Sequence, residues 1–167
     1  MNRFEISDAE KVDWTGTINN VHRFSTIPNV VSGLRVKSNT CNEEISTVDL
    51  SRFDFVKKVE IGSNSLQHAQ QLTMNGLNKL TSFEIGEGSF NQSKTVNIGS
   101  NSLNAMAELN LQTFQSLNEV SIGEGSMNAV GSVSASGLTG LTQFIVNANS
   151  LEETTEYVNN NNNHYYY

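Results

Sequence analysis

The segment Ile61-Gly62-Ser63-Asn64-Ser65-Leu66 indicates the kind of fold, because the same pattern returns along the chain. Close copies span residues 85–90, 98–103 and 122–127, and looser copies span residues 36–41 and 146–151. Repetition of one short unit is the sequence signature of a solenoid, in which each coil stacks on the next. The copies therefore predict a repeat protein.

Each copy closes a short stretch of alternating apolar and polar residues. Val59 and Ile61 flank Glu60, so a strand here points two apolar side chains inward and the carboxylate outward. The chain must then bend before the next apolar residue packs. The bend position holds Asn64 in one copy and Gly88 in the next. Both suit a bend, because Asn can bond to the backbone and Gly tolerates positive φ.

Read with their preceding residues, the copies fill the pattern L-x-x-L-x-L-x-x-N-x-L. One copy is filled by Val56, Val59, Ile61, Asn64 and Leu66. Over residues 21–151 the chain resembles the leucine-rich repeat superfamily, and its I-G-x-x-S-F step is most similar to BspA-like proteins of protists and bacteria. The resemblance implies a solenoid whose extended surface binds other proteins. It names no partner, because such repeats serve many roles.

A second kind of strand lies between these copies and sets the length of the coil. One series of strand starts is spaced by 24 residues throughout: Val48, Leu72, Val96, Val120 and Phe144. The intervening series is spaced by 24, 26 and 24 residues: Val59, Phe83, Leu109 and Val133. We therefore expect a mainly β repeat solenoid of the leucine-rich-repeat type, with two short strands per coil and little regular helix.

The alternation of repeat copies with strands of the second kind is interrupted once, between Phe83 and Val96. Two copies follow one another there without a strand of the second kind, so the two loop types should exchange edges in the middle of the solenoid. Residues 59–90 and 96–127 also align at an offset of 37 residues, which suggests an internal duplication. A three-sided helix with coils of 37 residues is the alternative, although it does not align the units before Val48.

The two ends depart from the repeat. Residues 1–20, which include Phe4 and Trp14, are expected to cap the N-terminal end of a solenoid that spans residues 21–151. Residues 152–167 are expected to form a polar cap turn and a low-complexity tail rich in Asn and Tyr. The tail either moves freely or docks on a partner or on another copy.

The composition excludes several functions. The 167 residues suit one domain, and a formal net charge of -7 provides no basic surface for nucleic acid. No apolar run approaches the roughly 20 residues of a membrane span, so we expect no membrane insertion. The N-terminal residues lack a secretory signal, which makes an intracellular location the default. The single cysteine, Cys41, excludes a disulfide framework.

The reactive residue types do not gather into a catalytic or metal-binding motif. The histidines are scattered: His22, His68 and His164. Cys41 stands where other copies have Leu or Phe, so it should be a buried hydrophobic residue. The Gly-Glu-Gly loops lack the lysine of a phosphate-binding loop, and Glu87 would repel a phosphate. Adjacent carboxylates such as Glu43 and Glu44 do not make an acid–base pair by spacing alone. We expect no enzyme activity, no metal and no cofactor.

Two functions remain. The first is a non-catalytic protein–protein interaction or scaffold module that uses the solenoid surface. The alternative is a structural subunit that self-assembles, or stacks end to end, into a larger assembly or filament. The partner is accordingly another protein or copies of the chain itself. The candidate partner-binding residues are the outward strand positions and the terminal tyrosines: Asp49, Thr73, Asn97, Ser121, Glu60, Glu84, Asn110, Tyr165, Tyr166 and Tyr167.

The strand register makes a simple expectation for substitutions in one strand. Ile85 should point inward, so Ile85→Asp should unfold the chain by burying an unpaired charge. Glu84 should point outward, so Glu84→Lys should leave the fold intact.

Overall fold

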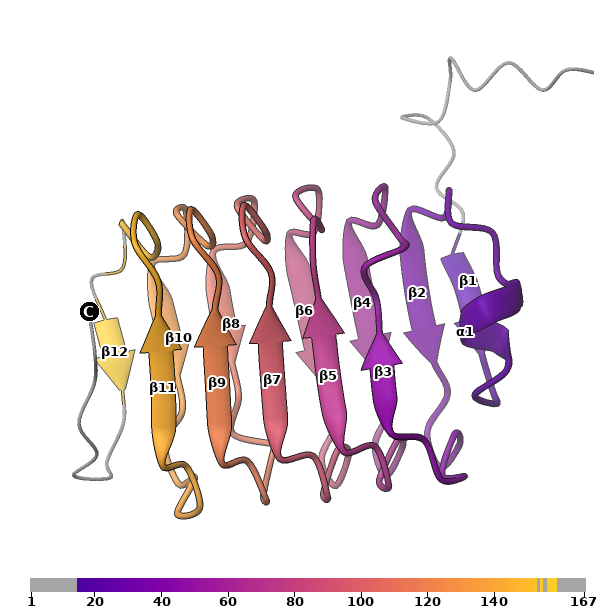
Figure 1. Ribbon diagram of the computed structural model, residues 1–167. Helices are drawn as coiled ribbons and strands as arrows, with labels where there is room; N and C mark the ends of the chain where they lie inside the picture. Colours follow the sequence, from indigo (N-terminus) through magenta and orange to yellow (C-terminus); the bar gives the residue numbers. More distant parts are fainter. Residues whose placement is uncertain (1–14, 153, 155, 159–167) are drawn as a thin grey trace, which may run out of the picture.

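The computed structural model describes residues 15–152, 154 and 156–158. This part of the chain is a parallel β-solenoid with about 24 residues per coil and almost no helix. The strands on the two sides run in opposite directions, so each coil crosses the molecule twice (Figure 1). The expected mainly β solenoid, with two short strands per coil and little helix, is confirmed. The three-sided alternative is wrong, because strands 37 residues apart lie on opposite sides rather than on top of one another.

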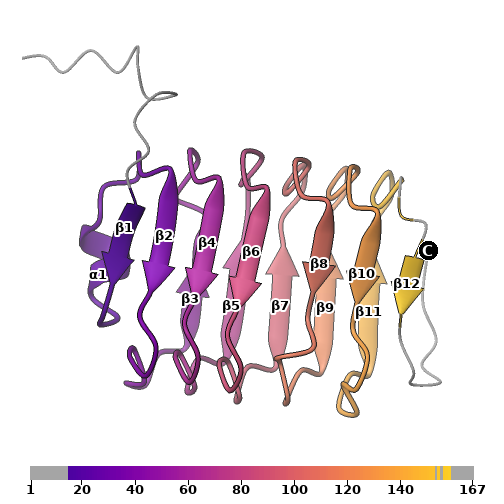
Figure 2. The same ribbon diagram turned by 180° about the vertical axis from the view of Figure 1, so that it is seen from behind.

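The strands form three parallel sheets in the described part of the chain. The elements are β1 (Thr15–Ile18), α1 (Arg23–Thr26), β2 (Gly33–Val36), β3 (Thr47–Asp49), β4 (Lys58–Ile61), β5 (Gln71–Met74), β6 (Ser82–Ile85), β7 (Thr95–Ile98), β8 (Glu108–Asn110), β9 (Glu119–Ile122), β10 (Ser132–Ser134), β11 (Gln143–Val146) and β12 (Glu156–Val158). Sheet A has the order β1-β2-β4-β6, sheet B the order β11-β9-β7-β5-β3, and sheet C the order β12-β10-β8. Sheet B covers one side, and sheets A and C follow one another on the other side (Figures 1 and 2).

Inward residues of successive coils stack in register and make the core. Ile98 pairs with Met74 on one side and with Ile122 on the other. All three side chains are at most 3% exposed. The rings of Phe90 and Phe114 stack in the same interior, with their centroids 5.2 Å apart. Hydrophobic burial along this column is the main stabilising term of the fold.

The repeated loops exchange edges in the middle of the solenoid, as the sequence predicts. The copies that begin at Ile61 and Ile85 follow strands β4 and β6 of sheet A. The copies that begin at Ile98 and Ile122 follow strands β7 and β9 of sheet B. Because the two sides run in opposite directions, the two pairs of loops lie at opposite edges.

Each loop turns through two residues with left-handed backbone conformation. The predicted bend positions have positive φ, 55° at Asn64 and 72° at Gly88. The sequence does not predict the second one, the apolar residue that closes the loop. Leu66 and Phe90 both have a φ of 54° and are fully buried. Burial offsets the cost of this backbone, which is about 1 kcal/mol or more for a non-glycine residue.

The glycine after each isoleucine is required for another reason, the close approach of successive coils. A Cβ on Gly123 would lie 2.5 Å from the backbone nitrogen of Ser100 in the preceding coil. A separation under 3.0 Å forces backbone to move. The I-G step therefore needs its glycine, because the loops of successive coils stack too closely for a side chain at this position.

Buried serine hydroxyls connect the loops of neighbouring coils. The Ser126 hydroxyl donates to the carbonyl of Gly99 at 2.6 Å and accepts from the N–H of Ser102 at 3.0 Å. The Ser126 N–H in turn donates to the hydroxyl of Ser150 at 3.2 Å. An equivalent arrangement joins Thr40, Ser65 and Ser89 at the opposite edge. We call each of these arrangements a hydroxyl ladder.

Two fully buried serines are expected to respond oppositely to alanine. Ser126→Ala should lower the free energy of unfolding by about 1–3 kcal/mol, because it leaves buried backbone groups without partners. Ser93→Ala should leave stability unchanged or raise it by up to about 1 kcal/mol, because the Ser93 hydroxyl is buried without a hydrogen-bond partner among the described residues. Urea unfolding of the two variants checks this. An equal loss of unfolding free energy in both variants would contradict a stabilising role for the hydroxyl ladder.

A short helix lies at the N-terminal end on the side of sheet B. Arg52 holds it: its guanidinium donates to the carbonyls of Phe24, Ser25 and Ile27 at 3.1, 2.7 and 3.2 Å. Within the expected N-terminal cap segment, β1 continues sheet A, and residues 1–14 lie outside the described residues. Among the described residues, no helix is long and apolar enough to cross a membrane.

Candidate functional site

A row of polar side chains crosses the outer face of sheet B. It consists of register partners on β3, β5, β7 and β9: Asp49, Thr73, Asn97 and Ser121. These candidate residues therefore form one straight line, which continues to Ile145 on β11. Asp49 also accepts a hydrogen bond from the N–H of Ser51 at 2.9 Å. The row offers hydroxyl and amide groups and one carboxylate.

Ion pairs join the outward side chains of sheet A. Glu60 lies between two cations, with Oε2 2.6 Å from Arg35 Nε and Oε1 2.8 Å from Lys58 Nζ. The Lys58 ammonium is also 3.1 Å from Glu84 Oε1. Hydrogen bonds from Lys58 and then Arg35 hold the pKa of Glu60 below its ordinary value. These pairs lie at the surface, so they contribute little to stability.

The side opposite sheet B is interrupted between β6 and β8. These strands belong to different sheets, and within the described residues no hydrogen bond joins them. In Figure 2 the ribbon of β7, from the opposite side, is visible behind β6 and β8. The longer coil of 26 residues, from Phe83 to Leu109, lies at this interruption. The two extra residues therefore coincide with a loss of strand pairing.

Backbone groups from both strands face the interruption. Alternate residues of a parallel strand bond to opposite neighbours. In β6 the N–H of Ser82 donates back to the Lys57 carbonyl at 3.2 Å, so the N–H and C=O of Phe83 and Ile85 are directed toward β8. In β8, Glu108 and Asn110 are correspondingly directed toward β6. These four residues leave polar backbone groups for a ligand or for water.

The opening is a cleft of about 490 Å³, which we call the β6–β8 slot. Its defining residues are Phe83, Glu84, Ile85, Glu108, Asn110 and Thr113. Phe83 and Ile85 occupy inward positions, in register with Val59 and Ile61 of β4. Val59 and Ile61 are buried, whereas Phe83 and Ile85 are only partly buried. The slot thus has an apolar floor that the neighbouring coils lack.

A hydroxyl ladder also ends at the slot. The N–H of Ser89 donates to the carbonyl of Gly86 at 3.3 Å, where earlier coils use a hydroxyl of the next coil. In the next coil Thr113 precedes Phe114, as Ser89 precedes Phe90, so Thr113 is at the position of the next ladder residue. Its Oγ1 is buried and has no hydrogen-bond partner among the described residues. Thr113 lines the slot, but its Oγ1 is covered and does not face the opening.

No family model, curated protein or solved structure matches the chain. The resemblance to leucine-rich repeat proteins accordingly rests on the repeat pattern alone.

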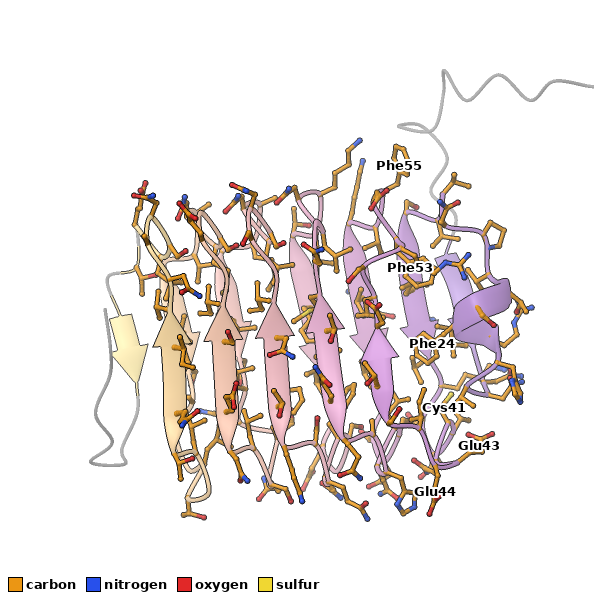
Figure 3. The ribbon with its side chains drawn as sticks, viewed as in Figure 1. Phe24, Cys41, Glu43, Glu44, Phe53 and Phe55 are labelled. Atoms are coloured by element: carbon orange, nitrogen blue, oxygen red, sulfur yellow. The ribbon has the colours of Figure 1, made fainter. Side chains whose placement is uncertain are left out.

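The reactive residues lie apart from the slot. Cys41 is 3% exposed, which confirms its expected burial. Burial raises the pKa of its thiol, and the carboxylate of Glu43 adds to the rise, so the thiol is a poor nucleophile. Glu43 and Glu44 are exposed at the edge of the solenoid (Figure 3). His22 is exposed beside α1. No three His, Cys, Asp or Glu side chains in the described part of the chain lie close enough to hold a metal ion.

The structure divides the predicted candidate residues among three places. Glu84 and Asn110 line the slot, Glu60 lies beside it on sheet A, and the row from Asp49 to Ser121 lies on the opposite side. The remaining candidates lie outside the described residues: Tyr165, Tyr166 and Tyr167.

Sequence reasoning missed most of the slot. It did not single out Glu108 or Thr113, and it placed Ile85 inward without an opening beside it. The available signal was the 26-residue spacing between Phe83 and Leu109. The exposure of Ile85 also makes Ile85→Asp a weak test of the register, because a carboxylate there can reach solvent.

Proposed function

We propose that this chain is a non-catalytic binding module that holds another protein against one side of the solenoid. The observation that carries the proposal is the β6–β8 slot, where unpaired backbone groups surround an apolar floor. Exposed strand edges and a partly buried apolar surface are features through which proteins recognise polypeptides. Polar outward residues on sheets A and C flank the slot and provide further contacts.

The resemblance to leucine-rich repeat proteins supports the same proposal, since solenoids present extended binding surfaces. Self-assembly through end-to-end stacking ranks second. Helix α1 lies at the N-terminal end on the side of sheet B, and Arg52 fixes it there through hydrogen bonds to three carbonyls. This arrangement leaves less room for another copy to continue sheet B at that end.

Site-specific photo-crosslinking in an extract of the native source tests the proposal. A photoreactive residue is placed at Asn110 beside the slot, at Asn97 on sheet B, or at the exposed Glu124 in an edge loop. We expect a discrete protein adduct from Asn110 and none from Glu124, and Asn97 shows whether sheet B contributes. Adducts of equal yield from all positions, or from none, would contradict a directed binding surface.

A further inference from the structure

The width of the β6–β8 slot limits what can enter it. Cα atoms of β6 and β8 approach within 8 Å of one another. An inserted strand would need about twice the normal spacing, roughly 9.6 Å, because it must pair on both sides. At this closest approach a complete strand is therefore too wide, whereas a flat side chain needs less separation between the two walls. A partner polypeptide would lie across the opening and insert one side chain.

The walls of the slot favour a cation. Backbone carbonyls of both strands face the opening, and the carboxylates of Glu84 and Glu108 stand beside it. Glu84 is 62% exposed, and only its Oε1 contacts Lys58, at 3.1 Å. Glu108 has no ion pair within the described residues. The slot therefore presents hydrogen-bond acceptors and an uncompensated negative charge.

The floor of the slot favours a flat, partly apolar group. The aromatic ring of Phe83 and the aliphatic side chain of Ile85 line it. A guanidinium group is planar, carries five N–H donors, and stacks on aromatic rings. An ammonium group matches the charge but has neither the flat shape nor the number of donors.

We propose that the β6–β8 slot binds an arginine side chain presented by a partner polypeptide. This inference rests on the proposed function and specifies the chemistry of the partner. The aliphatic part of the arginine packs on Ile85, the guanidinium lies over Phe83, and its N–H groups donate to wall carbonyls and to Glu84 and Glu108. Sheets A and C support the residues on either side of the arginine.

Titration of the isotope-labelled full chain with short peptides tests this proposal by NMR. The probe is acetyl-Gly-Arg-Gly-amide, and the matched peptides carry citrulline, which has the same shape without charge, or lysine, which has charge without the plane. We expect saturable shifts at the amides of residues 83–85 and 108–113. The citrulline and lysine peptides should bind at least about 10-fold more weakly.

Variants of the slot provide the matched controls. Glu84→Gln combined with Glu108→Gln should weaken arginine binding at least about 10-fold. Glu119→Gln combined with Glu124→Gln makes the same charge change on the side of sheet B and in its edge loop, and should leave binding unchanged. Thr113→Val keeps the shape of the side chain and should leave both binding and stability unchanged, because the covered Oγ1 has no partner to lose among the described residues.

Three results would overturn the arginine site: no saturable shift, shifts spread over sheet B and the edges, or equal binding of the citrulline peptide. If the arginine peptide does not bind the slot but crosslinking at Asn110 still yields a discrete adduct, the chain is a binding module whose partner is recognised by another group. If crosslinking fails while arginine binds the slot, the proposed use of the solenoid surface is wrong. The two experiments therefore separate the two proposals.

Discussion

Replacement of Ile122 by aspartate is expected to unfold the protein at neutral pH. Ile122 is fully buried at the end of β9, in register with Ile98 on one side and Val146 on the other. The buried set in the described part of the chain consists of apolar residues and serines, so no cation is available to pair with the new carboxylate. A buried unpaired charge costs about 4 kcal/mol or more, a large part of typical domain stability.

The neighbouring residue supplies the control. Ser121 points outward on the same strand, so Ser121→Asp should change the free energy of unfolding by no more than about 0.5 kcal/mol. Circular dichroism and urea unfolding of both variants measure the difference. A stable Ile122→Asp protein, or a Ser121→Asp protein that loses as much stability, would contradict the register of sheet B. Ile85→Asp should be milder than Ile122→Asp, because Ile85 borders the slot.

The repeat made most of the fold predictable. The 24-residue spacing of Val48, Leu72 and Val96 gives the stacked strands β3, β5 and β7 of sheet B directly. Alternation around Glu60 gives the inward and outward residues of β4. The exchange of loop edges also follows from the sequence, because strand position depends on the count of strands rather than on the loop type.

Other features depend on geometry that a pattern of residue types does not contain. Leu66 looks like an ordinary core residue, yet it adopts a left-handed backbone because the loop must turn within a few residues. Arg52 caps α1 through carbonyls 25 to 28 residues earlier in the chain. Such a contact depends on how the first coils stack, and nothing in its local sequence marks it.

The candidate site was only partly predictable. The outward positions of Glu84 and Asn110 follow from alternation, and both line the slot. The slot itself arises because two extra residues between Phe83 and Leu109 separate β6 from β8. Their number is visible in the sequence, but they could equally have lengthened an edge loop and left the strands paired. The unpartnered hydroxyl of Thr113 follows from that separation.

The slot and its proposed ligand both depend on the interruption of the sheet between β6 and β8. Amide hydrogen exchange, followed by NMR on the full chain, measures it most directly. The amides of Phe83, Ile85, Glu108 and Asn110 face the slot and lack sheet partners among the described residues. The register equivalents of the first two are Val59 and Ile61, which lie in β4 with a paired strand on each side.

We predict that the four slot amides exchange roughly 100-fold or more faster than the amides of Val59 and Ile61. The expected contrast is large because an unpaired amide exchanges directly with water, whereas a paired amide must wait for the sheet to open. If the four amides are as protected as those of Val59 and Ile61, then β6 and β8 are paired in solution. In that case the slot does not exist, and the proposed arginine site is wrong.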